Sequence, residues 1–363
     1  MRQNLQKKSP AIDAVMRYAR RLGFGDIHHV VCTKTQLNAI IAVHDTTLGP
    51  AIGGCRFYNY PNYTNALTDA LRLSSMMTFK NAACGLAHGG GKTVVQVPRG
   101  PYCRQALFER LGDFIQNING RYITAMDVGT TNKDMDAIAR RTPHVIGASQ
   151  SDPLQSDPSP FTARGVFRGI QAAVKTVWQS DTLENLTVAI QGVGKVGHHL
   201  ARQLYALGAK IIVCDTNTEA TDQLADECDA TIVAPDQIMQ VNCDIFSPCA
   251  FGGSINQQAV RQLTAKVIAG CANNQLAHRN VGRTLHERGI LYAPDFMINA
   301  GGVIQAASIH DYHDIAVANK KIDCLYDHLI EVFERAQHEN IPTTEVGYQI
   351  AFERLSHAQQ EAQ

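Results

Sequence analysis

The sequence lacks long apolar runs and an excess of either charge. No stretch reaches the roughly 18 consecutive apolar residues that a membrane span needs. The first fifteen residues are basic but lack the apolar core of a secretory signal. Lys and Arg total 33, as do Asp and Glu, and no basic run is interleaved with aromatics. These absences argue against membranes and nucleic acids as partners and predict a cytoplasmic protein.

Cysteine is present but not in a metal-binding or disulfide pattern. The ten cysteines are scattered, no CxxC occurs, and the closest pair along the chain is Cys243 and Cys249. Two histidine doublets, at 28–29 and 198–199, also lack ligand spacing, because adjacent side chains diverge on a strand or a helix. We therefore expect no metal site, and thiols that are mostly reduced and buried.

Residues 187–215, TVAIQGVGKVGHHLARQLYALGAKIIVCD, show a complete dinucleotide-binding pattern of strand, glycine turn, helix, strand and acid. Three glycines allow a tight turn, an approach of the pyrophosphate to the backbone, and close packing of helix on strand. An acid after the second strand hydrogen-bonds ribose hydroxyls and repels an added phosphate, which favours NAD over NADP. The candidate cofactor-binding residues here are Gly192, Gly194, Lys195, Val196, Gly197 and Asp215.

Two lysines, Lys80 and Lys92, bracket a glycine-rich segment in MTFKNAACGLAHGGGK, residues 77–92. Apolar spacing predicts a helix over 64–79, TVVQV after Lys92 reads as a strand, and glycines 89–91 are expected to form a tight turn. One ammonium group could hold a carboxylate while the other acts as a base, since a second cation and an apolar surround favour a neutral amine. Taken singly, either lysine also fits a solvated helix face.

The 363 residues are 45% hydrophobic, enough for two α/β domains. We expect a substrate domain over 1–148 and a Rossmann dinucleotide-binding domain over 149–334, with chemistry in the cleft between them. The first has strand candidates at 28–33, 38–44, from 93, and 121–125, and a second helix at 103–117. The polar segment 149–162, with three prolines, is the expected connection. Alternating strands and helices from residue 165 onward predict a doubly wound parallel sheet.

Four segments, TTLGPAIGGCRFY, MTFKNAACGLAHGGGK, YITAMDVGT and INAGGV, resemble the glutamate/leucine/phenylalanine/valine dehydrogenase family. The resemblance runs from about residue 28 to the C-terminus and is closest to leucine dehydrogenases. It implies reversible NAD-dependent oxidative deamination of a branched-chain L-amino acid to a 2-oxo acid and ammonia, by a homo-oligomer. It also implies that helices from about 335 to 363 complete the first domain.

The same resemblance assigns site residues by position. Lys80 matches the lysine that pairs with the substrate carboxylate, Lys92 the catalytic lysine, and Asp127 the aspartate that relays protons. Gly53 and Gly54 match glycines of the substrate cleft. Thr162, Asn274 and Asn299 match cofactor contacts, and Asn274 also lies near the reacting carbon. The side-chain pocket would be uncharged and aliphatic: Ile52, Ala125, Ile146, Val303 and Ala306.

Glutamate is therefore not the expected substrate, whereas leucine, valine and isoleucine are, with a phenylalanine or valine dehydrogenase as the alternative. Met126 and His88 depart from the leucine dehydrogenase pattern, and we hypothesise that they shift specificity or the pH optimum. A non-catalytic NAD-binding regulator would have lost Lys92 or Asp127, yet both are present. A hydroxy-acid dehydrogenase is disfavoured because the histidine and arginine expected for that chemistry do not occur in a recognisable motif of this sequence.

Overall fold

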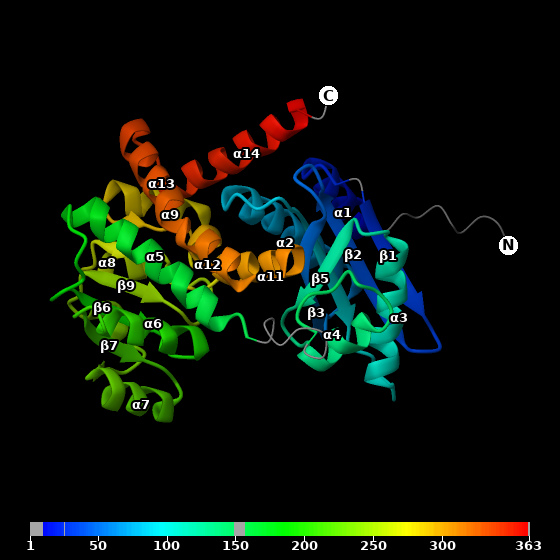
Figure 1. Ribbon diagram of the computed structural model, residues 1–363, viewed down its shortest axis with the longest axis horizontal. Coiled ribbons are helices and arrows are strands. Elements are labelled where there is room, and N and C mark those ends of the chain that lie inside the picture. Colours follow the sequence, from blue (N-terminus) through cyan, green and yellow to red (C-terminus); the bar gives the residue numbers. More distant parts are fainter. Residues whose placement is uncertain (1–9, 25, 149–156, 362–363) are drawn as a thin grey trace. The chain divides into compact units, whose positions relative to one another are not determined.

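The computed structural model describes residues 10–24, 26–148 and 157–361, and the chain divides into two compact α/β units (Figure 1). The first comprises Met1–Ser156 and Ala351–Gln363, and the second Asp157–Ile350. The expected two-domain α/β class is confirmed. The chain re-enters the first unit at Ala351, inside the last helix α14 (Thr343–Glu361), whereas the resemblance placed this return near residue 335.

A five-stranded mixed sheet forms the centre of the first unit, in the order β1-β2-β4-β3-β5. β2 pairs antiparallel with β1 and β4, while β3 pairs parallel with β4 and β5. The strands are β1 (Asp26–Cys32), β2 (Leu37–Asp45), β3 (Ala51–Tyr58), β4 (Gly89–Gln96) and β5 (Tyr122–Met126). Strand β3 was not predicted, because Gly53 and Gly54 weaken its β pattern.

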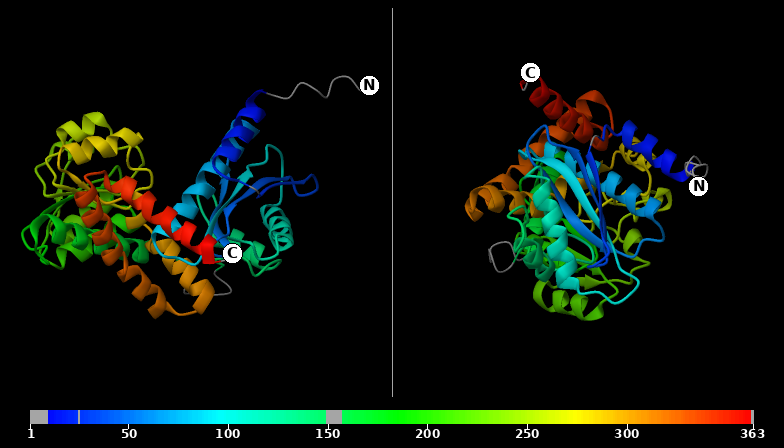
Figure 2. Two further views of the ribbon diagram at one scale, coloured as in Figure 1. Left: turned by 90° about the horizontal axis from the view of Figure 1, so that it is seen from above. Right: turned by 90° about the vertical axis from the view of Figure 1, so that its right-hand side faces the viewer.

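Helices cover both faces of this sheet. α1 (Pro10–Arg21) and α2 (Tyr63–Ala83) pack on one face, and α3 (Arg104–Asn117) and α4 (Asn132–Ala139) on the other. Figure 2 shows α3 beside β1 and β2. Side chains alternate accordingly along β4, so Val94 joins the core under α2 while Val95 joins the core under α3. The face that Lys92 shares with Val94 is therefore the α2 face.

The three glycines before Lys92 do not form the expected tight turn. They open β4, and the turn lies earlier, around Gly85 at φ +70°. A Cβ on Gly90 would lie 2.1 Å from the Thr78 nitrogen in α2, and one on Gly91 2.5 Å from the Tyr122 ring. Glycine is needed here because backbone and side chains approach β4 from both faces.

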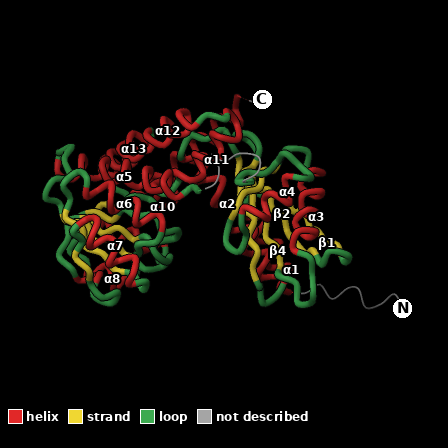
Figure 3. Tube along the Cα trace, turned by 60° about the horizontal axis from the view of Figure 1, so that its bottom comes forward, coloured by secondary structure: helices red, strands yellow, loops and turns green. Residues whose placement is uncertain are grey.

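The second unit contains a six-stranded, fully parallel sheet in the order β11-β10-β9-β6-β7-β8, drawn in yellow in Figure 3. The predicted doubly wound sheet is thus confirmed. Its strands are β6 (Thr187–Gln191), β7 (Lys210–Cys214), β8 (Thr231–Ile232), β9 (Ile245–Pro248), β10 (Val267–Ile268) and β11 (Leu291–Tyr292).

Helices and one 3₁₀ turn alternate with these strands. They are α5 (Ser159–Trp178), α6 (Lys195–Tyr205), α7 (Thr218–Cys228), η2 (Ile238–Gln240), α8 (Gln257–Gln262), α9 (Arg279–Glu287), α10 (Asp295–Ile298), α11 (Gly301–Tyr312), α12 (Ile315–Asp323) and α13 (Leu325–Glu339). No helix in the described part of the chain is long and apolar enough to cross a membrane.

The described part of the expected connection over 149–162 contains the start of a helix. Residues 149–156 lie outside the described residues, but α5 begins at Ser159, so Thr162 is helical. Pro158 is the N-cap residue and Pro160 lies in the first turn, where a missing N–H leaves no helical hydrogen bond unmade. The prolines here begin a helix rather than interrupt one.

The last turn of α2, which carries Lys80, is fixed by the C-terminal helix. Arg354 donates from Nη1 to the carbonyl oxygens of Ala82 and Ala83, at 2.9 and 2.8 Å. The rings of Phe79 and Phe352 pack at 5.0 Å between centroids. The guanidinium thus satisfies the Ala83 carbonyl at the helix end and adds a charged donor to the Ala82 carbonyl, which also accepts from the Gly85 N–H at 3.1 Å.

We expect Arg354→Ala to lower the free energy of unfolding by about 1–3 kcal/mol, because two acceptors lose a charged donor. Urea denaturation checks this. The matched control is Gln359→Ala, an exposed residue on the same helix, and equal stability of the two variants would contradict the capping role.

Candidate functional site

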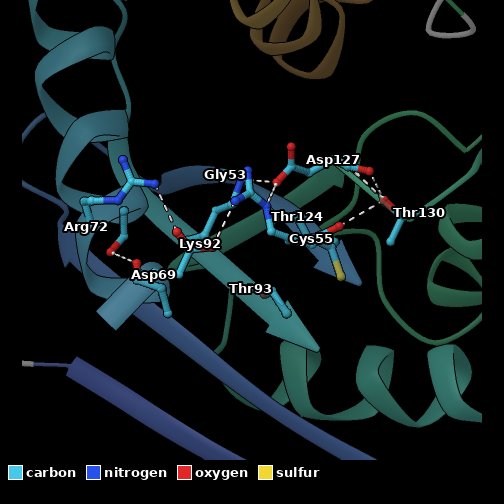
Figure 4. Close-up of polar contacts among 12 residues, drawn as sticks. Gly53, Cys55, Asp69, Arg72, Lys92, Thr93, Thr124, Asp127 and Thr130 are labelled. Atoms are coloured by element: carbon cyan, nitrogen blue, oxygen red, sulfur yellow. Dashed lines mark hydrogen bonds and ion pairs between the residues drawn. The ribbon is translucent and has the colours of Figure 1, made fainter. Parts of the chain in front are cut away.

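A buried ion pair joins two residues that the sequence singled out. Lys92 in β4 is only 6% exposed, and its Nζ lies 2.6 Å from Oδ2 of Asp127, which follows β5 (Figure 4). β3 separates these strands in the sheet, so the lysine side chain must cross β3 to reach the carboxylate. The structure thus brings together the proposed base and the proposed proton relay.

Gly54 makes that crossing possible. It lies beside Lys92 in the sheet, since β3 and β4 pair in register from Ile52 to Tyr58. A Cβ on Gly54 would lie 2.7 Å from the Asp127 Cβ and 3.1 Å from the Lys92 Nζ. Any side chain at position 54 would push the Lys92 ammonium and the Asp127 carboxylate apart, so the contact between them requires glycine at this position.

Arg56 is a site residue that the sequence reasoning missed. It lies two residues after Gly54, hence on the same face of β3, and its Nε donates to Asp127 Oδ2 at 3.0 Å. The same carboxylate oxygen therefore accepts from Lys92 and Arg56. Had β3 been identified in AIGGCRFY, its period of two would have placed Arg56 beside the lysine.

The guanidinium of Arg56 is itself held in place. Nη1 donates to Asp69 Oδ2 at 2.9 Å, and Asp69 also accepts from Tyr60 and Arg72 of the same unit. Burial raises the pKa of Asp69, but the Tyr60 hydroxyl and the two guanidinium groups outweigh it and leave the pKa lowered. This chain of charges links α2 to the reacting pair.

Asp127 is held ionised and oriented. Burial acts to raise its pKa, but the Lys92 ammonium and the Arg56 guanidinium outweigh burial and bring the pKa below its usual range. Its backbone N–H donates to the Thr130 hydroxyl at 2.9 Å. A carboxylate fixed in this way can accept a proton from a neighbour and return it without moving.

The other first-unit candidates lie around this pair or in the core. Gly53 accepts from the buried Tyr122 hydroxyl at 3.0 Å, and Lys80 is half-buried in the last turn of α2. Ala125 is half-buried at the end of β5, whereas Ile52 and Ile146 are 1% and 3% exposed. Ile52 and Ile146 are therefore covered by other protein atoms and expose almost no surface to a substrate.

His88 and Met126, the two departures from the leucine dehydrogenase pattern, have structural partners. His88 is buried, and its Nδ1 lies 3.1 Å from the Pro50 carbonyl oxygen, so this nitrogen must donate. Met126 is half-buried and packs against the core under α3 and α4. These contacts explain both residues as packing, and their effect on activity stays a hypothesis.

In the second unit, the glycine loop between β6 and α6 fits a dinucleotide. Gly192 has φ +96°, and a Cβ on Gly197 would lie 2.2 Å from the Gly192 oxygen, so both require glycine. A Cβ on Gly194 would meet nothing within 4 Å, which leaves its backbone open to a ligand. Asp215 accepts from the Val193 N–H at 2.7 Å and thereby ties the loop to the end of β7.

Lys195 and Val196 open α6, where the N–H groups of the first turn are available to an anion. Lys195 is exposed, and its Nζ lies 3.2 Å from Asp157. The glycine spacing, the open approach at Gly194 and the helix N-terminus together match the chemistry of a pyrophosphate. The residues present therefore fit the pyrophosphate of a dinucleotide.

The remaining second-unit candidates lie on α5, on α11 and at the carboxyl edge of the sheet. Thr162 donates to the Pro158 carbonyl at 3.0 Å, and Asn274 is exposed with φ +52°. Asn299 is buried and donates to the Cys271 carbonyl at 3.1 Å. Val303 and Ala306 are half-buried and three residues apart, hence on one face of α11.

Two comparisons with known proteins address identity. The model of the Glu/Leu/Phe/Val dehydrogenase dimerisation domain matches residues 28–144, and that of the glutamate/leucine/phenylalanine/valine dehydrogenases matches 158–221 and 215–362. The chain belongs to this family. It is 51% identical to a leucine dehydrogenase of Geobacillus stearothermophilus, over 89% of this chain and 88% of that protein.

Other relatives carry other substrate names. A valine dehydrogenase of Streptomyces albus is 43% identical over 89% of each chain. The crystal structure of L-tryptophan dehydrogenase from Nostoc punctiforme superposes with a TM-score of 0.86 at 36% identity, covering 95% of this chain and 99% of that one. The resemblance stated from the four motifs is confirmed, and the protein is an amino acid dehydrogenase.

We expect Gly54→Ala to lower kcat/KM by roughly 100-fold, because displacement of Lys92 or Asp127 by even an ångström spoils proton transfer. NADH affinity should not change. Gly100→Ala is the matched control, since a Cβ there meets nothing within 4 Å. Equal steady-state activity of the two variants would refute the crossing argument.

We expect Arg56→Gln to move the acidic limb of the kcat/KM profile to higher pH by about one unit. The sign follows from the charge: Arg56 lowers the pKa of Asp127, so its removal raises that pKa and a higher pH is needed to ionise the carboxylate. Arg56→Lys retains a cation and should move the limb less. An unchanged acidic limb in Arg56→Gln would show that Arg56 does not act on Asp127.

Proposed function

We propose that this protein catalyses the reversible NAD-dependent oxidative deamination of branched-chain L-amino acids, leucine foremost, to 2-oxo acids and ammonia. The observation that carries the proposal is the 2.6 Å contact between buried Lys92 and Asp127. Removing the Lys92 ammonium from water is costly and such pairs add little to stability, which favours a chemical role over a purely structural one.

Lys80 is proposed to hold the substrate carboxylate. The glycine loop between β6 and α6 would hold NAD, which would supply the acceptor for the hydride that the substrate α-carbon loses. Lys92, once its ammonium has passed a proton to Asp127, removes a proton from the water that attacks the resulting imine. Asp127 then returns the proton to the amino group of the carbinolamine. As the C–N bond breaks and ammonia leaves, the hydroxyl oxygen becomes the 2-oxo group and its proton passes to Asp127. Arg56 is proposed to keep Asp127 ionised between these transfers.

A branched-chain substrate is supported by the chemistry of the candidate pocket. The three half-buried candidates, Ala125, Val303 and Ala306, are uncharged and aliphatic, so none pairs with a second carboxylate such as that of glutamate. Relatives named leucine and valine dehydrogenases cover most of this chain. Selectivity among apolar side chains rests on about 1–3 kcal/mol per methylene, so valine or phenylalanine as the preferred substrate is the alternative.

NAD rather than NADP is supported by Asp215, whose carboxylate at the end of β7 would repel a phosphate on the ribose. A homo-oligomer is supported by the family description of residues 28–144 as a dimerisation domain. No polyanionic partner is proposed, since the formal net charge is zero.

The test measures NADH formation with leucine, valine, isoleucine, phenylalanine and glutamate, and with NADP in place of NAD. We expect turnover of the first three with NAD, and a loss of at least about 1000-fold in kcat for Lys92→Ala. Lys80→Gln should chiefly raise KM, by about tenfold or more, since it removes the partner of the carboxylate. NAD binding without turnover of any amino acid would overturn the proposal in favour of a regulator.

A further inference from the structure

Two thiols that are distant in sequence meet at the carboxyl edge of the second-unit sheet. Cys249 directly follows β9 and Cys271 lies just after β10, and these strands are parallel neighbours paired at Phe246 and Ile268. The Cys271 Sγ lies 3.7 Å from the Cys249 carbonyl oxygen. Both residues are half-buried free cysteines.

The two thiols differ in character. The Cys271 thiol donates to the Cys249 carbonyl oxygen. The neighbouring Cys271 thiol lowers the pKa of Cys249; burial opposes this, and the Ser247 hydroxyl, 3.4 Å away, assists it. The pKa of Cys271 is raised by the adjacent Cys249 thiol and by burial. An attacking thiolate beside a protonated thiol is the arrangement that dithiol oxidation requires.

This pair adjoins the glycine loop. The Cys249 N–H donates to the Gln191 carbonyl at 2.7 Å, directly before Gly192. A Cβ on Gly197 would lie 3.6 Å from the Cys249 Cβ, and one on Gly192 2.7 Å from the Ala250 Cβ. Movement of Cys249 toward Cys271 would therefore alter the packing under the loop where the dinucleotide is proposed to bind.

We propose that Cys249 and Cys271 form a reversible disulfide under peroxide, and that the disulfide lowers the affinity of the second unit for its dinucleotide. The cross-link itself is independent of the proposed function. Its effect on affinity rests on the proposed NAD site.

The chemistry balances with hydrogen peroxide as the oxidant. The Cys249 thiolate attacks one peroxide oxygen, the O–O bond breaks, and a sulfenic acid and hydroxide form. The Cys271 sulfur, losing its proton, attacks the sulfenic sulfur and displaces a second hydroxide. The two released protons convert both hydroxides to water. Two thiols and one peroxide thus give one disulfide and two waters, and an added dithiol restores the thiols.

The experiment treats the full-length protein with hydrogen peroxide, blocks the remaining thiols and maps the peptides by mass spectrometry. We expect linked peptides containing Cys249 and Cys271, lighter by two hydrogens and separated by dithiothreitol. NADH affinity, measured by fluorescence titration, should fall by about tenfold or more in the oxidised protein and recover on reduction. NADH bound beforehand should slow the cross-link.

Two variants act as controls. Cys271→Ser should bind NADH as the untreated protein does and form no cross-link. Cys103→Ser, which removes an exposed thiol of the first unit, should retain both the cross-link and the affinity change. Peroxide treatment that yields sulfenic or sulfinic Cys249 without linked peptides would overturn the disulfide.

The remaining outcomes separate the disulfide from the proposed function. Linked peptides with unchanged NADH affinity would overturn the effect on binding but support the disulfide. Failure of the reduced protein to bind NADH at all would overturn the proposed cofactor, while the peptide map would still decide whether the disulfide forms.

Discussion

The contact between Lys92 and Asp127 is the interaction that most of the first unit serves. A lysine that is 6% exposed loses most of its hydration, and a single partly buried carboxylate would hardly offset that loss. Arg56 supplies a second cation to the same carboxylate oxygen, and Asp69 anchors Arg56 in turn. Lys92 and Asp127 are thus held by a network of charges rather than by a single ion pair.

Glycines in the mixed sheet make this network possible because they have no side chain to block the close contacts. Because Gly54 has no side chain, the Lys92 side chain can pass over β3 to reach Asp127. Gly90 and Gly91 likewise let α2 and the Tyr122 ring pack closely against β4. Helix α2 carries Asp69 and Lys80, and Arg354 of α14 caps its end. The proposed carboxylate holder and the reacting pair therefore depend on the same close packing of α2 against the sheet.

The second unit gathers its chemistry at the carboxyl ends of parallel strands, as open α/β sheets generally do. The glycine loop after β6 and the acid after β7 lie at this edge, as do the thiols after β9 and β10. Parallel neighbours β9 and β10 pair residues that are 22 positions apart in the sequence, such as Phe246 and Ile268. Cys249 and Cys271, which follow these strands, are separated by the same number and therefore come close together. The same geometry that forms the proposed dinucleotide site also brings the two thiols to this edge of the sheet.

The sequence by itself determined the α/β class, the Rossmann sheet and the family, because strand and helix periods, glycine spacing and motif order are local properties. It also identified Lys92 and Asp127 through their motifs. Tertiary structure alone decided that β3 lies between them, that Arg56 joins them and that two thiols meet. Those contacts depend on strand order and register, since β4 lies between β2 and β3 although it follows both along the chain. Local pattern carries no information about such order.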